Sequence, residues 1–183
     1  MISEASRVLG VEVGSTAPLF LAVLAVHVPA GAACVITGAI AALSPKRPGR
    51  HPCAGTIYYV CLSVTFVSLV ALSVLRWPHD NHLLAIGVVG YAAATAGVTA
   101  RRRRWRGWPM WPRVHGTGMA VSYIALLTGF YVDNGPTLPV WDRLPHITYW
   151  LLPSVIGVPL LLRTLRRLTR PPQRTAATPP IQT

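Results

Sequence analysis

The chain has 183 residues, of which 52% are hydrophobic, and its mean hydropathy is positive. This is too much apolar material for one soluble core and too little chain for several soluble domains, so the composition excludes an ordinary soluble protein and favours one covered by a lipid bilayer. The 17 Lys and Arg residues against 5 Asp and Glu give a net charge of +12, and their positions along the chain carry information about orientation.

Apolar runs close to the roughly 20 residues that a bilayer requires predict five transmembrane helices. In chain order the predicted spans are 17–43, 54–75, 82–100, 114–132 and 147–162. We therefore expect an all-α membrane protein, a five-transmembrane-helix bundle over residues 17–165, preceded by an extracytoplasmic segment, 1–16, and followed by a disordered cytoplasmic tail, 166–183. The first run is too long for the core of a secretory signal, so it is predicted to be a retained helix.

The third run is rich in small residues at four-residue spacing, Gly90 with Ala94 and Ala93 with Gly97. Small residues let helix backbones approach closely in lipid, so this helix is predicted to be the most buried one. Prolines lie inside the first and fifth runs, and each frees the carbonyl four residues earlier, which marks either packing geometry or a ligand cavity. They are Pro29, Pro153 and Pro159.

Basic and acidic residues fall in different connections between the predicted spans. Most basic residues fall in the first and third connections and in the tail: Lys46, Arg47, Arg50, Arg101, Arg102, Arg103, Arg104, Arg106, Arg113, Arg163, Arg166, Arg167, Arg170 and Arg174. The acidic residues fall on the opposite side: Glu4, Glu12, Asp80, Asp133 and Asp142. Because Lys and Arg are retained on the cytoplasmic side, we expect a multi-pass membrane protein with its N-terminus out and its C-terminus in.

The run "RRRRWRGWPMWPR" interleaves cations with aromatic residues, a pattern that nucleic-acid-binding proteins also use. In a cytoplasmic loop the same arginines fix topology and attract anionic headgroups at about 1 kcal/mol each. We therefore expect the partners to be anionic lipid headgroups at the cytoplasmic face, together with a candidate membrane-protein partner, and no nucleic acid.

The histidines form two tiers. His51 and His115 stand at the cytoplasmic starts of the second and fourth spans, and His82 and His146 stand at the outer starts of the third and fifth. His27 precedes Leu43 by 16 residues, about 24 Å of helix, which places it in the outer tier. The sixth, His79, lies in an outer loop and needs no functional explanation.

Two tiers are what a diheme membrane cytochrome requires, because bis-imidazole iron needs two rings from different helices at one depth. This hypothesis pairs His51 with His115, and two of His27, His82 and His146 with each other, around haem b. Gly31 and Gly55 each follow a histidine by four residues on the same helical face, where they leave room either for a flat macrocycle or for a neighbouring helix.

Two other interpretations of the histidines stay open. One is a pocket for a quinone or another ligand around His27 and Pro29, since an ionisable group inside the membrane is a functional candidate. The other is purely structural, with the rings bonded to loop carbonyls.

The fourth run adds polar candidates. His115, Met119 and Ser122 share one helical face, and Asp133 begins a turn signal at the outer end, within reach of Arg143 or His146. The spans contain no nucleophile–base pair, phosphate loop or carboxylate pair, which favours a protein without hydrolytic chemistry and a non-enzyme over an enzyme. Three cysteines imply no disulfide framework, and their spacing predicts no zinc site.

The stretch "HVPAGAACVITGAIAALSPKRPGRHPCAGTIYY" and the closing half "FYVDNGPTLPVW" to "LPHITYWLLPSVIGVPLL" resemble a group of small bacterial multi-helix membrane proteins of unknown function. The matching positions include His27, Gly31, His51 and Gly55, while Pro52 departs from the arginine expected after the second histidine. The resemblance implies an inner-membrane protein and no particular activity. Three functions remain: a small non-hydrolytic membrane component, a haem- or quinone-binding redox protein, and a subunit or assembly partner of a larger complex.

Overall fold

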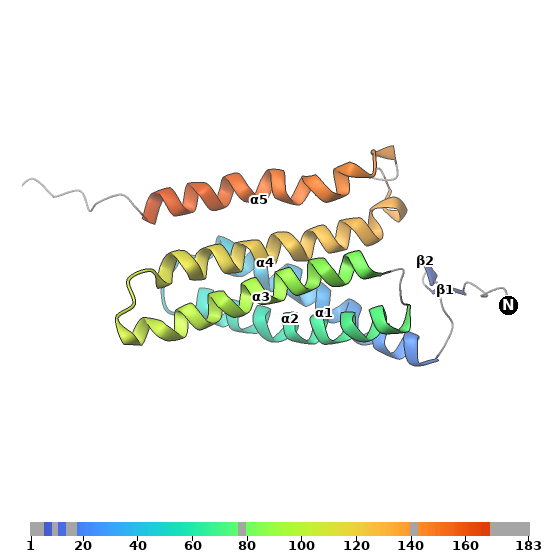
Figure 1. The fold of residues 1–183 in the computed structure, drawn as a ribbon, viewed down its shortest axis with the longest axis horizontal. Helices are drawn as coiled ribbons and strands as arrows, with labels where there is room; N and C mark the ends of the chain where they lie inside the picture. Colours follow the sequence, from blue (N-terminus) through green and yellow to red (C-terminus); the bar gives the residue numbers. More distant parts are fainter. Residues whose placement is uncertain (1–5, 9–10, 14–17, 77–79, 140–142, 169–183) are drawn as a thin grey trace, which may run out of the picture.

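A computed structural model describes residues 6–8, 11–13, 18–76, 80–139 and 143–168. It contains five long helices: α1 (Pro18–Leu43), α2 (Arg50–Leu75), α3 (Asn81–Arg103), α4 (Trp111–Asn134) and α5 (Ile147–Leu168). Short 3-10 turns, η1 (Arg104–Arg106) and η2 (Gly135–Thr137), follow α3 and α4, and a two-stranded antiparallel ribbon of β1 (Ser6–Val8) and β2 (Val11–Val13) precedes α1 (Figure 1). The five predicted helices are therefore confirmed, with ends that differ by several residues; α5 continues beyond the predicted 162.

Four helices of the described chain are long and apolar enough to cross a membrane. They are α1, α2, α3 and residues Ile147–Arg166 of α5. The expected span 114–132, within α4, is not among them, which corrects the prediction that all five runs qualify. The reason is its polarity, since His115, Thr117, Ser122 and Thr128 interrupt its apolar residues.

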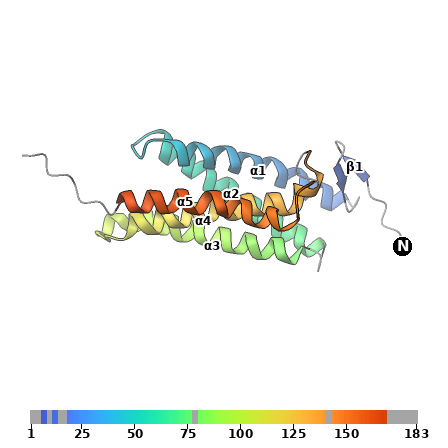
Figure 2. The same ribbon diagram turned by 90° about the horizontal axis from the view of Figure 1, so that it is seen from above.

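Helix α4 lies inside the bundle. Only Arg113, Phe130 and Asp133 of its residues are exposed, whereas α3 exposes a side that includes Val88 and Val89. Figure 1 shows α4 between α3 and α5, and Figure 2 shows α1 and α2 to one side of them. The prediction that the third run forms the most buried helix is therefore wrong, because α3 is an outer helix that buries only its small-residue face.

The bundle consists of two antiparallel hairpins and one added helix. We call α1 with α2 the first hairpin and α3 with α4 the second hairpin; α5 packs along α4. Close approach within the second hairpin runs through the predicted small residues: a Cβ on Gly118 would meet the Ala93 carbonyl oxygen and the Gly97 backbone, and one on Gly90 would lie 3.0 Å from Ala125. The small-residue prediction for α3 is thus confirmed.

The interior core joins the two hairpins. Cys34, Tyr58, Leu62 and Ala94 are buried together, with Tyr123 among the side chains packed against them. The Tyr58 and Ser122 hydroxyls are 2.6 Å apart, and Tyr123 Oη donates to the Val35 carbonyl at 3.0 Å. Polar side chains that lower the mean hydropathy of α2 and α4 therefore form hydrogen bonds between helices, in an interior where water does not compete for these bonds.

Charge also separates by end of the bundle. The α1–α2 and α3–α4 connections lie at one end, which we call the basic end; within the described chain it carries Lys46, Arg47, Arg50, Arg101, Arg102, Arg103, Arg104, Arg106 and Arg113. The opposite end, which we call the acidic end, carries Asp80 and Asp133 together with Arg76 and Arg143. The structure therefore agrees with the predicted charge pattern in one respect, because the basic connections and the acidic residues lie at opposite ends of the bundle.

Candidate functional site

His51 and His115 meet at the basic end. Their ring centroids are 6.4 Å apart and the ring planes are nearly perpendicular, at 86°. Each lies in the opening turns of its helix, α2 and α4, and the preceding chain reverses direction through Gly49 at φ 112° and Gly107 at φ 71°. Such backbone angles favour glycine, so the sequence permits the turns that precede α2 and α4. The pairing expected from depth alone is therefore present in the structure, across the two hairpins.

Each of these rings is anchored through the same nitrogen. His51 Nδ1 donates to the Ala41 carbonyl at 2.8 Å, and His115 Nδ1 donates to the Gly97 carbonyl at 3.0 Å. A carbonyl oxygen only accepts, so Nδ1 carries the proton and Nε2 of a neutral ring keeps its lone pair. Histidines that ligate metals are usually held in this way, with the other ring nitrogen bonded to a carbonyl or carboxylate.

Positive charge surrounds the pair. Lys46 Nζ donates to the Ala41 and Ala42 carbonyls at 3.0 and 2.9 Å, capping the end of α1, and desolvation there lowers the pKa of Lys46 below its ordinary value. Lys46 and Arg101 lie close enough to His115 to interact with its charge. These cations disfavour a bare divalent ion and favour a ligand that carries carboxylates or phosphates. Within the described residues no group of three or more His, Cys, Asp or Glu side chains gathers around a common metal position.

The glycines that follow His27 and His51 face open space. A Cβ added to Gly31 or Gly55 would meet no atom within 4 Å. Neither glycine therefore admits a neighbouring helix, in contrast to Gly97, where a Cβ would lie 3.4 Å from the Met119 side chain. The alternative in which these two glycines serve helix packing is excluded for this bundle.

His27 is engaged inside the first hairpin. Its Nδ1 lies 2.9 Å from Ser68 Oγ, and that hydroxyl donates to the Val64 or Thr65 carbonyl at 2.8 or 3.0 Å. The serine therefore accepts from His27, and the ring ties α1 to α2. A shallow apolar groove of about 580 Å³ runs beside this bond over both helices, lined by Ala22, Val23, Val26, Ser63, Val64, Val67, Ser68 and Ala71. Pro29 is exposed and is not among the lining residues.

The remaining outer-tier histidines contact other groups. His82 is exposed at the start of α3, with its ring 6.1 Å from Trp150 of α5, and His146 is exposed just before α5, 5.6 Å from the Tyr149 ring. The described chain thus shows one histidine pair, at the basic end, and three outer histidines with separate neighbours. His79 lies outside the described residues.

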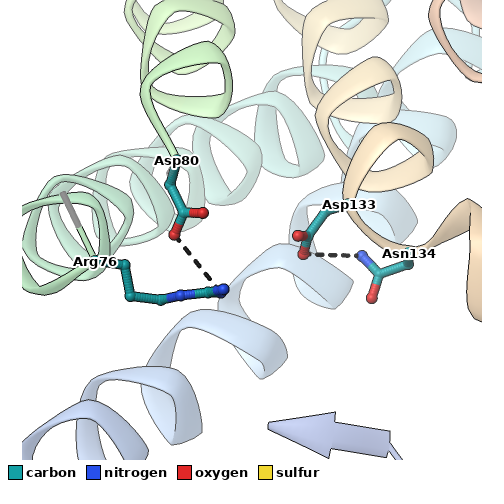
Figure 3. A network of polar contacts seen from close by, with 4 residues as sticks. All are labelled: Arg76, Asp80, Asp133 and Asn134. Carbon is teal, nitrogen blue, oxygen red and sulfur yellow. Dashed lines mark hydrogen bonds and ion pairs between the residues drawn. The ribbon is translucent and has the colours of Figure 1, made fainter. Parts of the chain in front are cut away.

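Asp133 belongs to a polar cluster at the acidic end. Its carboxylate lies 3.4 Å from Asn134 Nδ2 and near Arg76, whose guanidinium is 3.7 Å from Asp80 (Figure 3). Arg76 also lies over the Phe20 ring at 5.9 Å. Sequence reasoning considered Arg143 and His146 as neighbours of Asp133 and missed Arg76, which directly follows α2 and precedes Asp80 by four residues.

Comparison with known proteins adds no relative: no family model matches the chain, and no curated protein or solved structure is significantly similar to it. The interpretation of the site therefore depends on its geometry.

Proposed function

We propose that this protein is a small non-hydrolytic redox component of the bacterial cytoplasmic membrane, in which His51 and His115 bind one haem b at the cytoplasmic face. The observation that carries the proposal is the approach of the two rings from different hairpins. The resemblance to small bacterial membrane proteins is consistent with the location and supplies no activity. Haem, when bound, supplies one-electron redox chemistry.

The separation of the rings suits two ligands of one metal ion. The two ring centroids lie 6.4 Å apart, and His51 and His115 would hold the haem iron between them. Both rings have Nδ1 on a backbone carbonyl, so both have Nε2 available as the ligand atom.

The surroundings favour haem over an isolated ion. Haem b carries two propionates, and Lys46 and Arg101 supply cations beside the pair. The open side of Gly55, one turn beyond His51, leaves space along the face of α2 that the histidine occupies. The three outer histidines have separate neighbours, so the proposal is for one haem and not for two.

The proposed orientation has the basic end in the cytosol, the N-terminus out and the C-terminus in. It follows from the retention of Lys and Arg on the cytoplasmic side, and the same residues are proposed to contact anionic headgroups. A reporter fused after the last residue is expected to be active only in the cytosol. Activity of that reporter in the periplasm contradicts the orientation and moves the His51–His115 pair to the outer face.

The haem proposal is tested by absorption spectroscopy of the full chain purified in mild detergent. We expect a Soret band with about one haem per chain, and its loss in His51→Ala and in His115→Ala. His82→Ala and His146→Ala are matched controls, because both rings are exposed at the other end, and they are expected to retain the band. A colourless wild-type protein after expression with haem supply contradicts the proposal; co-purification of that colourless chain with a larger complex then identifies a subunit or assembly partner.

A further inference from the structure

The histidine pair is one of two side-chain contacts between α2 and α4, the other being Tyr58 with Ser122, and we call these two contacts the ladder. Both helices begin at the basic end, so they run parallel, and seven residues after each histidine comes Tyr58 on α2 and Ser122 on α4. Seven residues are nearly two helical turns, which returns a side chain to the same face about 10 Å further along. Tyr58 and Ser122 are hydrogen-bonded at 2.6 Å, so the second rung of the ladder has the same register as the first.

This second rung is deeply enclosed. Tyr58 is 1% exposed and Ser122 is 0% exposed. The Tyr58 ring contacts Tyr123 with centroids 6.1 Å apart, and Gly38 of α1 gives both rings room, since a Cβ there would meet Tyr123 and lie 3.1 Å from Tyr58. In this enclosed position a hydroxyl without a partner is costly, so the bond favours a single relative placement of α2 and α4.

We propose that Tyr58 and Ser122 are positioning residues that fix the register of α2 against α4 and thereby hold the His51 and His115 rings at the separation that one iron requires. The proposal rests on haem binding for its functional consequence and on the ladder for its geometry. The hydroxyl pair touches neither ring. It acts by holding the two helices from which the histidines project.

The test compares Tyr58→Phe with Tyr59→Phe. The second variant is a matched control, because Tyr59 Oη also bonds to a hydroxyl on another helix, Thr95 at 3.2 Å, but that bond joins α2 to α3. We expect Tyr58→Phe to raise the haem dissociation constant about fivefold, the change that a lost hydrogen bond of about 1 kcal/mol produces, and to convert part of the spectrum from low-spin to high-spin. Tyr59→Phe is expected to leave the spin state unchanged.

A second measurement does not depend on haem. Spin labels at Arg50→Cys and Arg113→Cys, both exposed beside the histidines, report the α2–α4 distance in a chain carrying Cys53→Ser and Cys61→Ser; Cys34 is fully buried and is kept. We expect Tyr58→Phe and Ser122→Ala to broaden the distance distribution and Tyr59→Phe to preserve it. Distributions and spectra that are the same in all variants overturn the positioning role. A wild-type chain without haem contradicts the proposed function alone, since the distance measurement still decides whether the ladder fixes the register.

Discussion

The two ends of the bundle use histidine differently. At the basic end His51 and His115 come from different hairpins and approach each other, each with Nδ1 bonded to a backbone carbonyl. At the acidic end His27 bonds to Ser68 within its own hairpin, and His82 faces Trp150. Both tiers were predicted from depth along the helices, and a shared depth brought two rings together at one end of the bundle only. What distinguishes the ends is which helices project the rings toward one another.

The acidic end is arranged around a cation. Figure 3 shows the Arg76 guanidinium paired with Asp80, with Asp133 of α4 nearby. The guanidinium also lies over the Phe20 ring of α1. A guanidinium in this position interacts favourably with carboxylates and an aromatic face, and unfavourably with a bound metal ion. The basic end has the converse arrangement, with two imidazole rings facing each other and Lys46 and Arg101 near them.

The largest expected effect comes from the helix contact that seats His115. In Gly118→Ala the new methyl group would meet the Ala93 carbonyl and the Gly97 backbone, and Gly97 is also the residue whose carbonyl holds His115. Backbone atoms cannot move aside as a flexible side chain does, so we expect a loss of about 2–3 kcal/mol in unfolding free energy together with loss of haem. The measurement is denaturant unfolding in detergent, followed by helical circular dichroism and by the Soret band.

Gly116→Ala is the control for this variant. A Cβ at Gly116 meets nothing within 4 Å, and alanine is the better helix former by about 1 kcal/mol, so this change is expected to be neutral or stabilising. Equal stability of the two variants would contradict the close approach of α3 and α4 and with it the seating of His115.

A smaller effect is expected at His27. In His27→Ala the bond to Ser68 is lost, and we expect a cost of about 1 kcal/mol in unfolding free energy with haem content unchanged. Ser68→Ala should cost a similar amount, and the double variant should cost less than both together, because the partners share one interaction. Loss of the Soret band in His27→Ala would remove the distinction between the two ends and restore a haem site in the outer tier.

Much of this fold follows from periodicity and composition. The sequence predicts the number of helices and the connections between them, because the length of each apolar run matches the thickness of a bilayer. It also predicts the close contact at Gly90 and Gly97, because small residues recur there at four-residue spacing. The pairing of His51 with His115 is also readable, since both stand at helix starts on one side. The interior position of α4 is not, because hydropathy registers Ser122 and Thr128 as unfavourable to a span and does not record that neighbouring helices bury them.

Unlike the histidine pair, whose members both stand at helix starts, other contacts between distant segments were beyond the sequence. Tyr58 and Ser122 are 64 residues apart, and no local pattern relates them. Both residues follow a histidine by seven positions, but this spacing becomes informative only once side chains of α2 and α4 are known to face each other. Arg76 was missed for a similar reason: its neighbours Phe20 and Asp133 come from α1 and α4.

The smallest expected effect is at the Arg76–Asp80 pair. The two side chains are 38% and 15% exposed with 3.7 Å between their charged atoms, and such a pair contributes between about 0 and 1 kcal/mol. Asp80 also lies near Asp133, so Asp80→Asn removes a repulsion between carboxylates along with the attraction to Arg76. We therefore expect a change in unfolding free energy of less than about 0.5 kcal/mol, which high salt reduces further by screening. A salt-insensitive loss above about 1.5 kcal/mol would show that the acidic end is an ordered network like the basic end, and that a guanidinium can fix helix positions there as firmly as the Tyr58–Ser122 bond is proposed to do.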